Sequence, residues 1–188
     1  MKRRGFILLC VIILVAVGYN KIGVLYPMEH FDTVKKYSDE YGVDPLLSMS
    51  VIKAESNFKA DATSHKSAAG LMQLTGETAR WCAEKLGIDY TDDMLYDTDF
   101  NIRAGVFYLS FLLGKYGGDI TAAAAAYNAG MGNVDKWLKN SEYSGDGATL
   151  DKTPFNETST YINKIKFNYK IYGLLYGGKE GTDKNESS

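Results

Sequence analysis

One carboxylate at the end of an otherwise apolar helix pattern constrains this chain more than any other feature. Residues 45–55 read PLLSMSVIKAE, and Glu55 follows Leu47 and Val51 at spacings of four residues, so the three share one helix face. Phe58 extends the same row three residues later. Acidic side chains are rarely buried without a partner, and no Lys or Arg lies one turn before Glu55 on this face. The pattern therefore predicts an unpaired carboxyl in apolar surroundings.

Such a carboxyl would suit acid catalysis. Burial in apolar surroundings raises the pKa of a carboxyl, and a raised pKa allows it to act as a general acid near neutral pH. The alternative is a solvated Glu55 at an ordinary helix end, followed by a polar loop and the tight turn Gly70-Leu71-Met72-Gln73. Periodicity alone leaves both interpretations open.

The rest of the chain predicts an all-α fold, because apolar residues recur at helical spacing and no strand pattern is found. Asp44 is expected to cap the helix that Pro45 opens, Gly42 to end the helix before it, and Asp99 to cap a long helix that begins at Phe100. The Ala-rich segment 120–129 should be central, since small side chains let neighbouring helices approach closely. Residues 141–152, rich in Gly, Ser and Asp, are expected to form a mobile loop. We expect helices over residues 29–41, 45–55, 75–86, 100–116, 120–129, 134–138 and from 154 onward.

The N-terminus has the pattern of a targeting segment. Basic residues 2–4 precede the apolar run 6–19, which is short for a membrane-spanning helix of ~20 residues but can be extended by its flanking residues. Ala16-Val17-Gly18 matches a signal-peptide cleavage site only in part. We therefore predict an uncleaved, single-pass signal anchor over residues 1–26, which places the domain of residues 27–176 outside the cytoplasmic membrane. Residues 177–188 are expected to be a disordered polar tail.

Charge and cysteine content exclude several classes of function. The net charge is −2, whereas a nucleic-acid-binding protein needs a basic face. Cys82 is the single cysteine outside the N-terminal segment and is expected to be a small buried hydrophobic residue. The acidic segment 92–99 lacks the spacing of a calcium loop, so we expect it to be solvated surface.

Three blocks of residues, in the same order along the chain, resemble the signature of the soluble-lytic-transglycosylase (SLT) family, whose fold is related to that of goose-type lysozyme. The similarity extends from about Pro45 to Tyr172. Ser67 departs from the family pattern, which usually has Gly there, and Gly76 stands where a Pro commonly opens the next helix. The blocks are Glu55-Ser56 with Ser64, Gly70-Leu71-Met72-Gln73 and Thr78-Ala79; Ala126-Tyr127-Asn128-Ala129-Gly130; and Pro154-Phe155-Asn156-Glu157-Thr158 with Tyr161.

The resemblance implies a compact, lysozyme-like enzyme that cleaves the MurNAc-GlcNAc β-1,4 bond in the glycan strands of peptidoglycan. Glu55 would donate a proton to the leaving oxygen and then accept one from the C6 hydroxyl of the substrate, which leaves a 1,6-anhydro-MurNAc end. Glu157 would orient the substrate, although a Glu in a first helical turn is more often a capping residue. The resemblance implies no cofactor and no metal. By the same resemblance, substrate is contacted by Ser56, Ser64, Met72, Gln73, Tyr127, Asn128, Glu157 and Tyr161.

Two other functions are compatible with these residues. A goose-lysozyme-like muramidase would use water in place of the C6 hydroxyl and would need a second carboxylate, for which Asp61 is close in sequence but lies in a predicted open loop. A non-catalytic glycan-binding scaffold would be expected to have lost its acid, and Glu55 is present.

Overall fold

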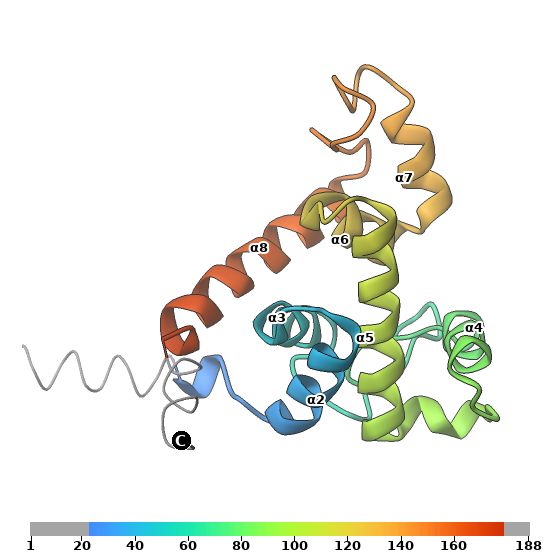
Figure 1. The fold of residues 1–188 in the computed structure, drawn as a ribbon, viewed down its shortest axis with the longest axis vertical. Coiled ribbons are helices and arrows are strands. Elements are labelled where there is room, and N and C mark those ends of the chain that lie inside the picture. Colours follow the sequence, from blue (N-terminus) through green and yellow to red (C-terminus); the bar gives the residue numbers. More distant parts are fainter. Residues whose placement is uncertain (1–22, 179–188) are drawn as a thin grey trace, which may run out of the picture.

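The computed structural model describes residues 23–178, and these residues form helices joined by loops. Within this part of the chain, β-structure is limited to two isolated bridges in the loop after Glu55. The predicted all-α class is therefore confirmed (Figure 1). The elements are α2 (Phe31–Tyr41), α3 (Pro45–Glu55), α4 (Gly76–Leu86), the 3-10 helix η1 (Asp92–Tyr96), α5 (Thr98–Lys115), α6 (Ile120–Ala129), α7 (Met131–Leu138) and α8 (Asn156–Tyr176).

Most of the predicted anchor, residues 1–22, lies outside the described residues, and so does the predicted tail from residue 179 onward. Among the helices of residues 23–178, none combines the length and the apolar character that a membrane span requires. Residues 26 and 27 are tied to α8: the Tyr176 hydroxyl donates to the Tyr26 carbonyl at 2.7 Å, and the Tyr172 hydroxyl to the Pro27 carbonyl at 3.0 Å. The aromatic edge of α8 thus fixes the chain where it enters the domain.

Helix α5 stands in the middle of the molecule (Figure 1). Helices α2 and α3 lie on one side of it and α4 on the other, while α6 lies near its C-terminal end. Helix α8 runs diagonally across α6 and α3, so it brings residues from the end of the chain to the end of α3. Helix α7 and the loop that follows it project away from the body.

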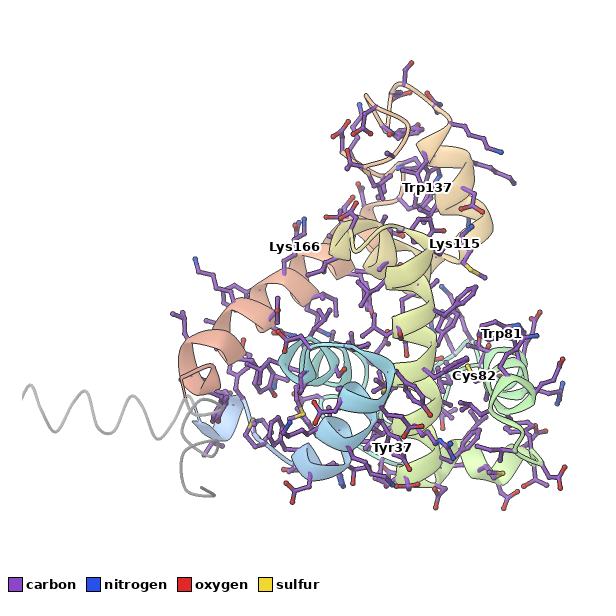
Figure 2. All side chains as sticks on the ribbon, viewed as in Figure 1. Tyr37, Trp81, Cys82, Lys115, Trp137 and Lys166 are labelled. Carbon is purple, nitrogen blue, oxygen red and sulfur yellow. The ribbon has the colours of Figure 1, made fainter. Side chains whose placement is uncertain are left out.

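The main core is formed by apolar side chains of α2, α3, α5, α6 and α8. Residues 122–126 of the Ala-rich helix are all buried, which confirms its central position. A second, smaller cluster joins α4 to α5 and contains Cys82, whose thiol has its pKa raised to about 12 by burial (Figure 2). The prediction that Cys82 is a buried hydrophobic residue is confirmed.

Local capping fixes most helix ends at the predicted places. The Asp44 carboxylate accepts from the Leu46 N–H at 2.8 Å, with Pro45 at the first helical position. Thr75 caps α4 by accepting from the Thr78 N–H. Gly42 ends α2 in the left-handed conformation, with a φ of 69°.

Several predicted boundaries are wrong. Helix α5 begins at Thr98, and Asp97 caps it by accepting from the Phe100 N–H at 2.8 Å. Asp99, the predicted cap, instead accepts a hydrogen bond of 2.6 Å from the Tyr37 hydroxyl of α2. Helix α7 begins three residues earlier than predicted, and α8 begins two residues after Pro154. The segment predicted as a mobile loop holds a tight turn in which Asp146 accepts from two backbone N–H groups.

Candidate active site

Glu55 is the last residue of α3, where the chain leaves the helix abruptly. After Ser56, the residues Asn57 and Phe58 have positive φ angles of 52° and 67°, so they turn the chain away from the helix axis. Phe58 is buried, as predicted, but through this turn and not on the helix face. The carboxyl of Glu55 consequently lies at an open end of an apolar helix, with the core behind it.

The Glu55 carboxyl has one direct partner, contributed by α8. The Tyr161 hydroxyl donates to Glu55 Oε1 at 2.6 Å, and the Lys164 ammonium, one turn further on, donates to the carbonyl of Ala54. Burial raises the pKa of Glu55 from 4.5 to about 7, although the hydrogen bond from Tyr161 and the charge of Lys164 both lower it. Desolvation therefore outweighs both stabilising contacts, and Glu55 titrates near neutral pH.

Tyr127, near the end of α6, also lies near the Glu55 carboxyl, whose charge acts on it. Its hydroxyl donates to the Met72 carbonyl at 2.8 Å, and its ring packs at 5.4 Å from that of Tyr108. Burial, followed by the charge of Glu55, raises the pKa of Tyr127 well above its usual value. The pKa of Tyr161 is raised in the same way. Both phenols are thus neutral near neutral pH, and the single proton of each is already donated, by Tyr161 to the Glu55 carboxyl and by Tyr127 to the Met72 carbonyl.

Asn101 of α5 organises the loop that carries Met72. Its amide donates to the carbonyls of Ala69 and Leu95 at 3.1 and 2.8 Å, and its Oδ1 accepts from the Met72 N–H at 2.8 Å. Gly70 has a φ of 79°, and a Cβ there would lie 2.3 Å from the Asn101 amide. The sequence reasoning missed Asn101, for which a polar residue inside the apolar stretch of α5 was the available signal.

The structure places Met72 and Gln73 differently from each other. Met72 is 0% exposed, and its side chain fills the space left by Gly105, where a Cβ would lie 2.3 Å from its sulfur. Its side chain therefore faces the core, and its peptide group faces Asn101 and Tyr127. Gln73 has a positive φ of 49°, and its amide nitrogen donates to the carbonyls of Ala62 and Gly70 at 2.9 Å.

The two serines predicted to contact substrate form hydrogen bonds with backbone groups. Ser56 is buried, and its hydroxyl donates back to the Ile52 carbonyl at 3.3 Å. Ser64 accepts from the N–H of Ala68 at 3.1 Å and is partly exposed. Ser67, which stands at the position of a usual family Gly, adopts a left-handed φ of 57°. The backbone at this position is therefore the one that a Gly would adopt without strain.

Asn128 and Glu157 line a cavity of about 250 Å³ at the start of α8, together with Lys66. Asn128 accepts a hydrogen bond of 3.0 Å from the Thr158 hydroxyl. Glu157 lies 3.5 Å from the Lys66 ammonium, and the two side chains are 70% and 61% exposed. Of the two predicted site residues on α8, Tyr161 is buried whereas Glu157 is solvated. The structure therefore brings Tyr161, but not Glu157, into contact with Glu55.

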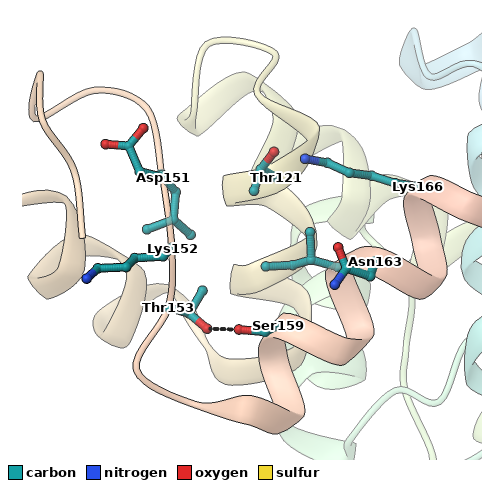
Figure 3. Close-up of a pocket in the computed structure, with 9 residues that line it drawn as sticks. Thr121, Asp151, Lys152, Thr153, Ser159, Asn163 and Lys166 are labelled. Atoms are coloured by element: carbon teal, nitrogen blue, oxygen red, sulfur yellow. Dashed lines mark hydrogen bonds between the residues drawn. The ribbon is translucent and has the colours of Figure 1, made fainter. Parts of the chain in front are cut away.

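A second pocket, of about 210 Å³, lies on the other side of α8 (Figure 3). It is lined by the segment 150–153, by Thr121 of α6 and by the outer residues of α8, among them Ser159 and Lys166. The Thr153 and Ser159 hydroxyls are hydrogen-bonded across it at 2.9 Å. None of the predicted site residues lines this pocket, so we do not assign the reaction to it. Residues 23–178 also contain no group of three or more His, Cys, Asp or Glu side chains able to hold a metal ion.

The comparisons with known proteins concern the family and the fold of the chain. A family model described as "Transglycosylase SLT domain" matches residues 32–148. A soluble lytic murein transglycosylase of Escherichia coli K12 is 29% identical over 157 residues, which are 82% of this chain and 24% of the relative. A membrane-bound lytic murein transglycosylase C of Actinobacillus pleuropneumoniae is 34% identical over 125 residues, which are 61% of this chain and 34% of the relative.

Among solved structures, an inactive mutant of the lytic transglycosylase Slt from Pseudomonas aeruginosa superposes with a TM-score of 0.74 at 33% identity. The match covers 81% of this chain and 25% of that one. The chain thus spans about a quarter of the length of the soluble relatives that it matches.

Proposed function

The chain belongs to the transglycosylase SLT family, with its lysozyme-like helical fold, and from this premise we propose that it cleaves the glycan strands of peptidoglycan as a lytic transglycosylase. The observation that carries the proposal is the state of Glu55. Burial raises the pKa of this carboxyl to about 7 while Tyr161 holds it in place at 2.6 Å. A group with this pKa can donate a proton and take one back at neutral pH.

In the first step, Glu55 donates its proton to the oxygen between MurNAc and GlcNAc as the glycosidic bond breaks. The anomeric carbon develops oxocarbenium character, and the new carboxylate of Glu55 remains hydrogen-bonded to Tyr161. The neutral phenol stabilises the ionised form, because a hydrogen bond to a charged acceptor is stronger than one to a neutral acceptor.

In the second step, the Glu55 carboxylate takes the proton of the substrate's own C6 hydroxyl, and that oxygen bonds to the anomeric carbon. The product is a 1,6-anhydro-MurNAc end, and no water is consumed. Within residues 23–178, no second carboxylate is recorded in contact with Glu55: Asp61 is exposed in the loop, and Glu157 is paired with Lys66. This supports an internal nucleophile, which needs no such residue and has a high effective concentration.

The predicted substrate contacts divide into two groups under this proposal. Ser64, Gln73 and Asn128 retain exposed surface from which they can reach a sugar, and so do Tyr127 and Glu157. The buried residues act indirectly. Met72 and Ser56 help to fix the backbone around the site, while Tyr161 holds the carboxyl of Glu55.

The product decides between this reaction and hydrolysis. Isolated peptidoglycan digested in ¹⁸O-labelled water should release muropeptides with anhydro ends, each one water lighter than the reducing form and without label at the anomeric carbon. Mass spectrometry of the released fragments measures both properties, and Glu55→Gln provides the blank. Labelled reducing ends as the main product would identify a muramidase, and binding without any cleavage would identify a scaffold module.

The second part of the proposal is that residues 1–26 anchor the domain to the membrane, on its cell-wall side. The basic residues 2–4 followed by an apolar run support it, and a membrane-bound enzyme is among the relatives. The full chain should then sediment with membranes and be digested by protease added outside spheroplasts. Recovery of the protein in the soluble fraction, with an N-terminus shortly after Gly18, would show that the segment is cleaved.

A further inference from the structure

We propose that Lys164 is a positioning residue for Glu55, an inference that rests on the proposed function: its ammonium ties the last turn of α3 to α8 and sets a positive charge beside the acid. The observation is a hydrogen bond from Lys164 Nζ to the carbonyl of Ala54, the residue that precedes Glu55. The two residues are 110 positions apart in the chain, so the contact exists only in the folded protein.

The hydrogen bond is placed where α3 needs one. The last carbonyls of a helix have no partner within the helix, and a cation near them also interacts favourably with the helix dipole. Glu55 ends α3, and its position depends on how this last turn is held. Lys164 lies one turn after Tyr161 on α8. Tyr161 holds the carboxyl of Glu55, and Lys164 holds the backbone of the same turn of α3.

The titratable groups near Glu55 come from three helices. Helix α8 contributes Tyr161 and Lys164, and α6 contributes Tyr127, which is uncharged at neutral pH. On α3 itself, Lys53 has its pKa lowered by burial and by the charge of Lys164, so the charge of Lys164 acts on both α3 side chains. Among these groups, the ones that lower the pKa of Glu55 are Tyr161, through its hydrogen bond, and then Lys164, through its charge.

The sign of the effect follows from this arrangement. A positive charge favours the ionised form of Glu55, so removing it should move the titration of Glu55 to higher pH. Lys164 is exposed, and salt screens an exposed charge more than a buried one. High salt should therefore raise the pKa of Glu55 in the wild-type protein, in the same direction as removal of the Lys164 charge but by less.

The test is a direct titration of Glu55 in the full chain. Carbon-13 NMR of the Glu55 carboxyl should show a higher midpoint in Lys164→Gln than in the wild type, and Lys164→Arg should restore the wild-type midpoint. Salt should raise the midpoint of the wild type and leave that of Lys164→Gln nearly unchanged. Lys166→Gln is the matched control, because Lys166 lies on the same helix but lines the pocket on its other side (Figures 2 and 3).

The kinetic readout is kept separate from the titration. Lys164→Gln should lower kcat on peptidoglycan by about two- to tenfold, the effect of one hydrogen bond, and should leave KM unchanged because the residue acts through Glu55. The alkaline limb of the pH profile of kcat should move to higher pH together with the NMR midpoint. An unchanged midpoint in Lys164→Gln would overturn the assignment of Lys164 while leaving the proposed function intact.

A midpoint that moves while the pH profile stays fixed would instead contradict the role of Glu55 as the acid. If Lys164→Gln fails to fold, the salt titration of the wild-type carboxyl decides the question alone. A midpoint insensitive to salt would then overturn the proposal.

Discussion

Glu55 and Glu157 were both predicted from the sequence as site residues, yet they occupy opposite environments. The Glu55 carboxyl lies against the core at the end of α3 and accepts a hydrogen bond from the neutral phenol of Tyr161. Glu157, one turn before Tyr161 on α8, is 70% exposed and lies near Lys66. Desolvation raises the pKa of Glu55 to about 7, whereas Glu157 keeps its contact with water.

The difference teaches that the role of a carboxylate follows from its solvation and its partners. A hydroxyl hydrogen bond cannot cancel the desolvation of a buried carboxyl, so Glu55 retains a proton near neutral pH. A solvated carboxylate beside a lysine is instead free to contact a polar substrate. The predictions below test whether the two glutamates differ as this comparison requires.

The largest effect is expected for the acid itself. Glu55→Gln keeps the size of the side chain and removes the transferable proton, so turnover on peptidoglycan should fall by roughly 10²–10⁴-fold. Circular dichroism should show an unchanged fold. Release of muropeptides over time measures the loss. Near-normal turnover in this variant would show that Glu55 is not the acid.

The second prediction concerns stability, and its sign follows from the pKa. Burial raises the pKa of Glu55 from 4.5 to about 7, so the folded state binds this proton more tightly than the unfolded state. The stability from this group is complete below pH 4.5 and is lost as the pH rises through about 7. At 1.36 kcal/mol per pH unit, the loss is about 3 kcal/mol in the free energy of unfolding.

Glu55→Gln removes this loss. Urea unfolding should therefore find the variant more stable than the wild type at pH 8, with the gap closing toward pH 4. Glu157→Gln is the matched control and should show no gap of this kind. An equal difference at both pH values would mean that Glu55 is not held in the protonated form by burial.

Local sequence signals predicted the helices, because each end depends on a few neighbouring residues. Asp44-Pro45 opens α3 and Gly42 closes α2 as the sequence indicated. The prediction failed where two neighbours could serve equally: Asp97 and Asp99 are both possible caps for α5. The choice depends on Tyr37, which lies 62 residues away and binds Asp99.

The partners of the site residues could not be predicted, because they come from distant segments. The Tyr161 contact with Glu55 spans 106 residues, and no periodicity encodes it. Met72 was predicted to contact substrate, but Gly105 leaves a space that its side chain fills. The sequence therefore predicted the position of Glu55 at the end of its helix, while the polar contacts that affect its pKa come from the fold.

The third prediction sharpens the comparison by removing one of these contacts. Tyr161→Phe deletes a hydrogen bond to a group that becomes charged, so activity should fall roughly ten- to a hundredfold. Since that bond lowers the pKa of Glu55, the alkaline limb of the pH profile should move to higher pH. Tyr172→Phe is the control, because the Tyr172 hydroxyl binds the Pro27 carbonyl instead. A pH profile that stays in place would show that Tyr161 does not act on the acid.

A smaller effect is expected when the solvated glutamate is changed. Glu157→Gln keeps a hydrogen-bonding group at the start of α8, so activity should fall only about two- to tenfold, with the pH profile of the wild type. Measuring the rates of Glu157→Gln and Glu55→Gln side by side compares the two losses of activity directly. If both variants lost activity equally and shared one pH dependence, Glu157 would have to take part in proton transfer.

The smallest effect is expected from the contact between Glu157 and Lys66. Both side chains are mostly exposed and lie 3.5 Å apart, and ion pairs of this kind contribute roughly 0–1 kcal/mol. A double-mutant cycle of Lys66→Gln and Glu157→Gln, read both as unfolding free energy and as kcat/KM, should give a coupling within that range. The coupling should also shrink in high salt, since exposed charges are screened. A coupling well above 1 kcal/mol would mean that Lys66 fixes Glu157 as firmly as Tyr161 fixes Glu55, and the two glutamates would then differ in solvation alone.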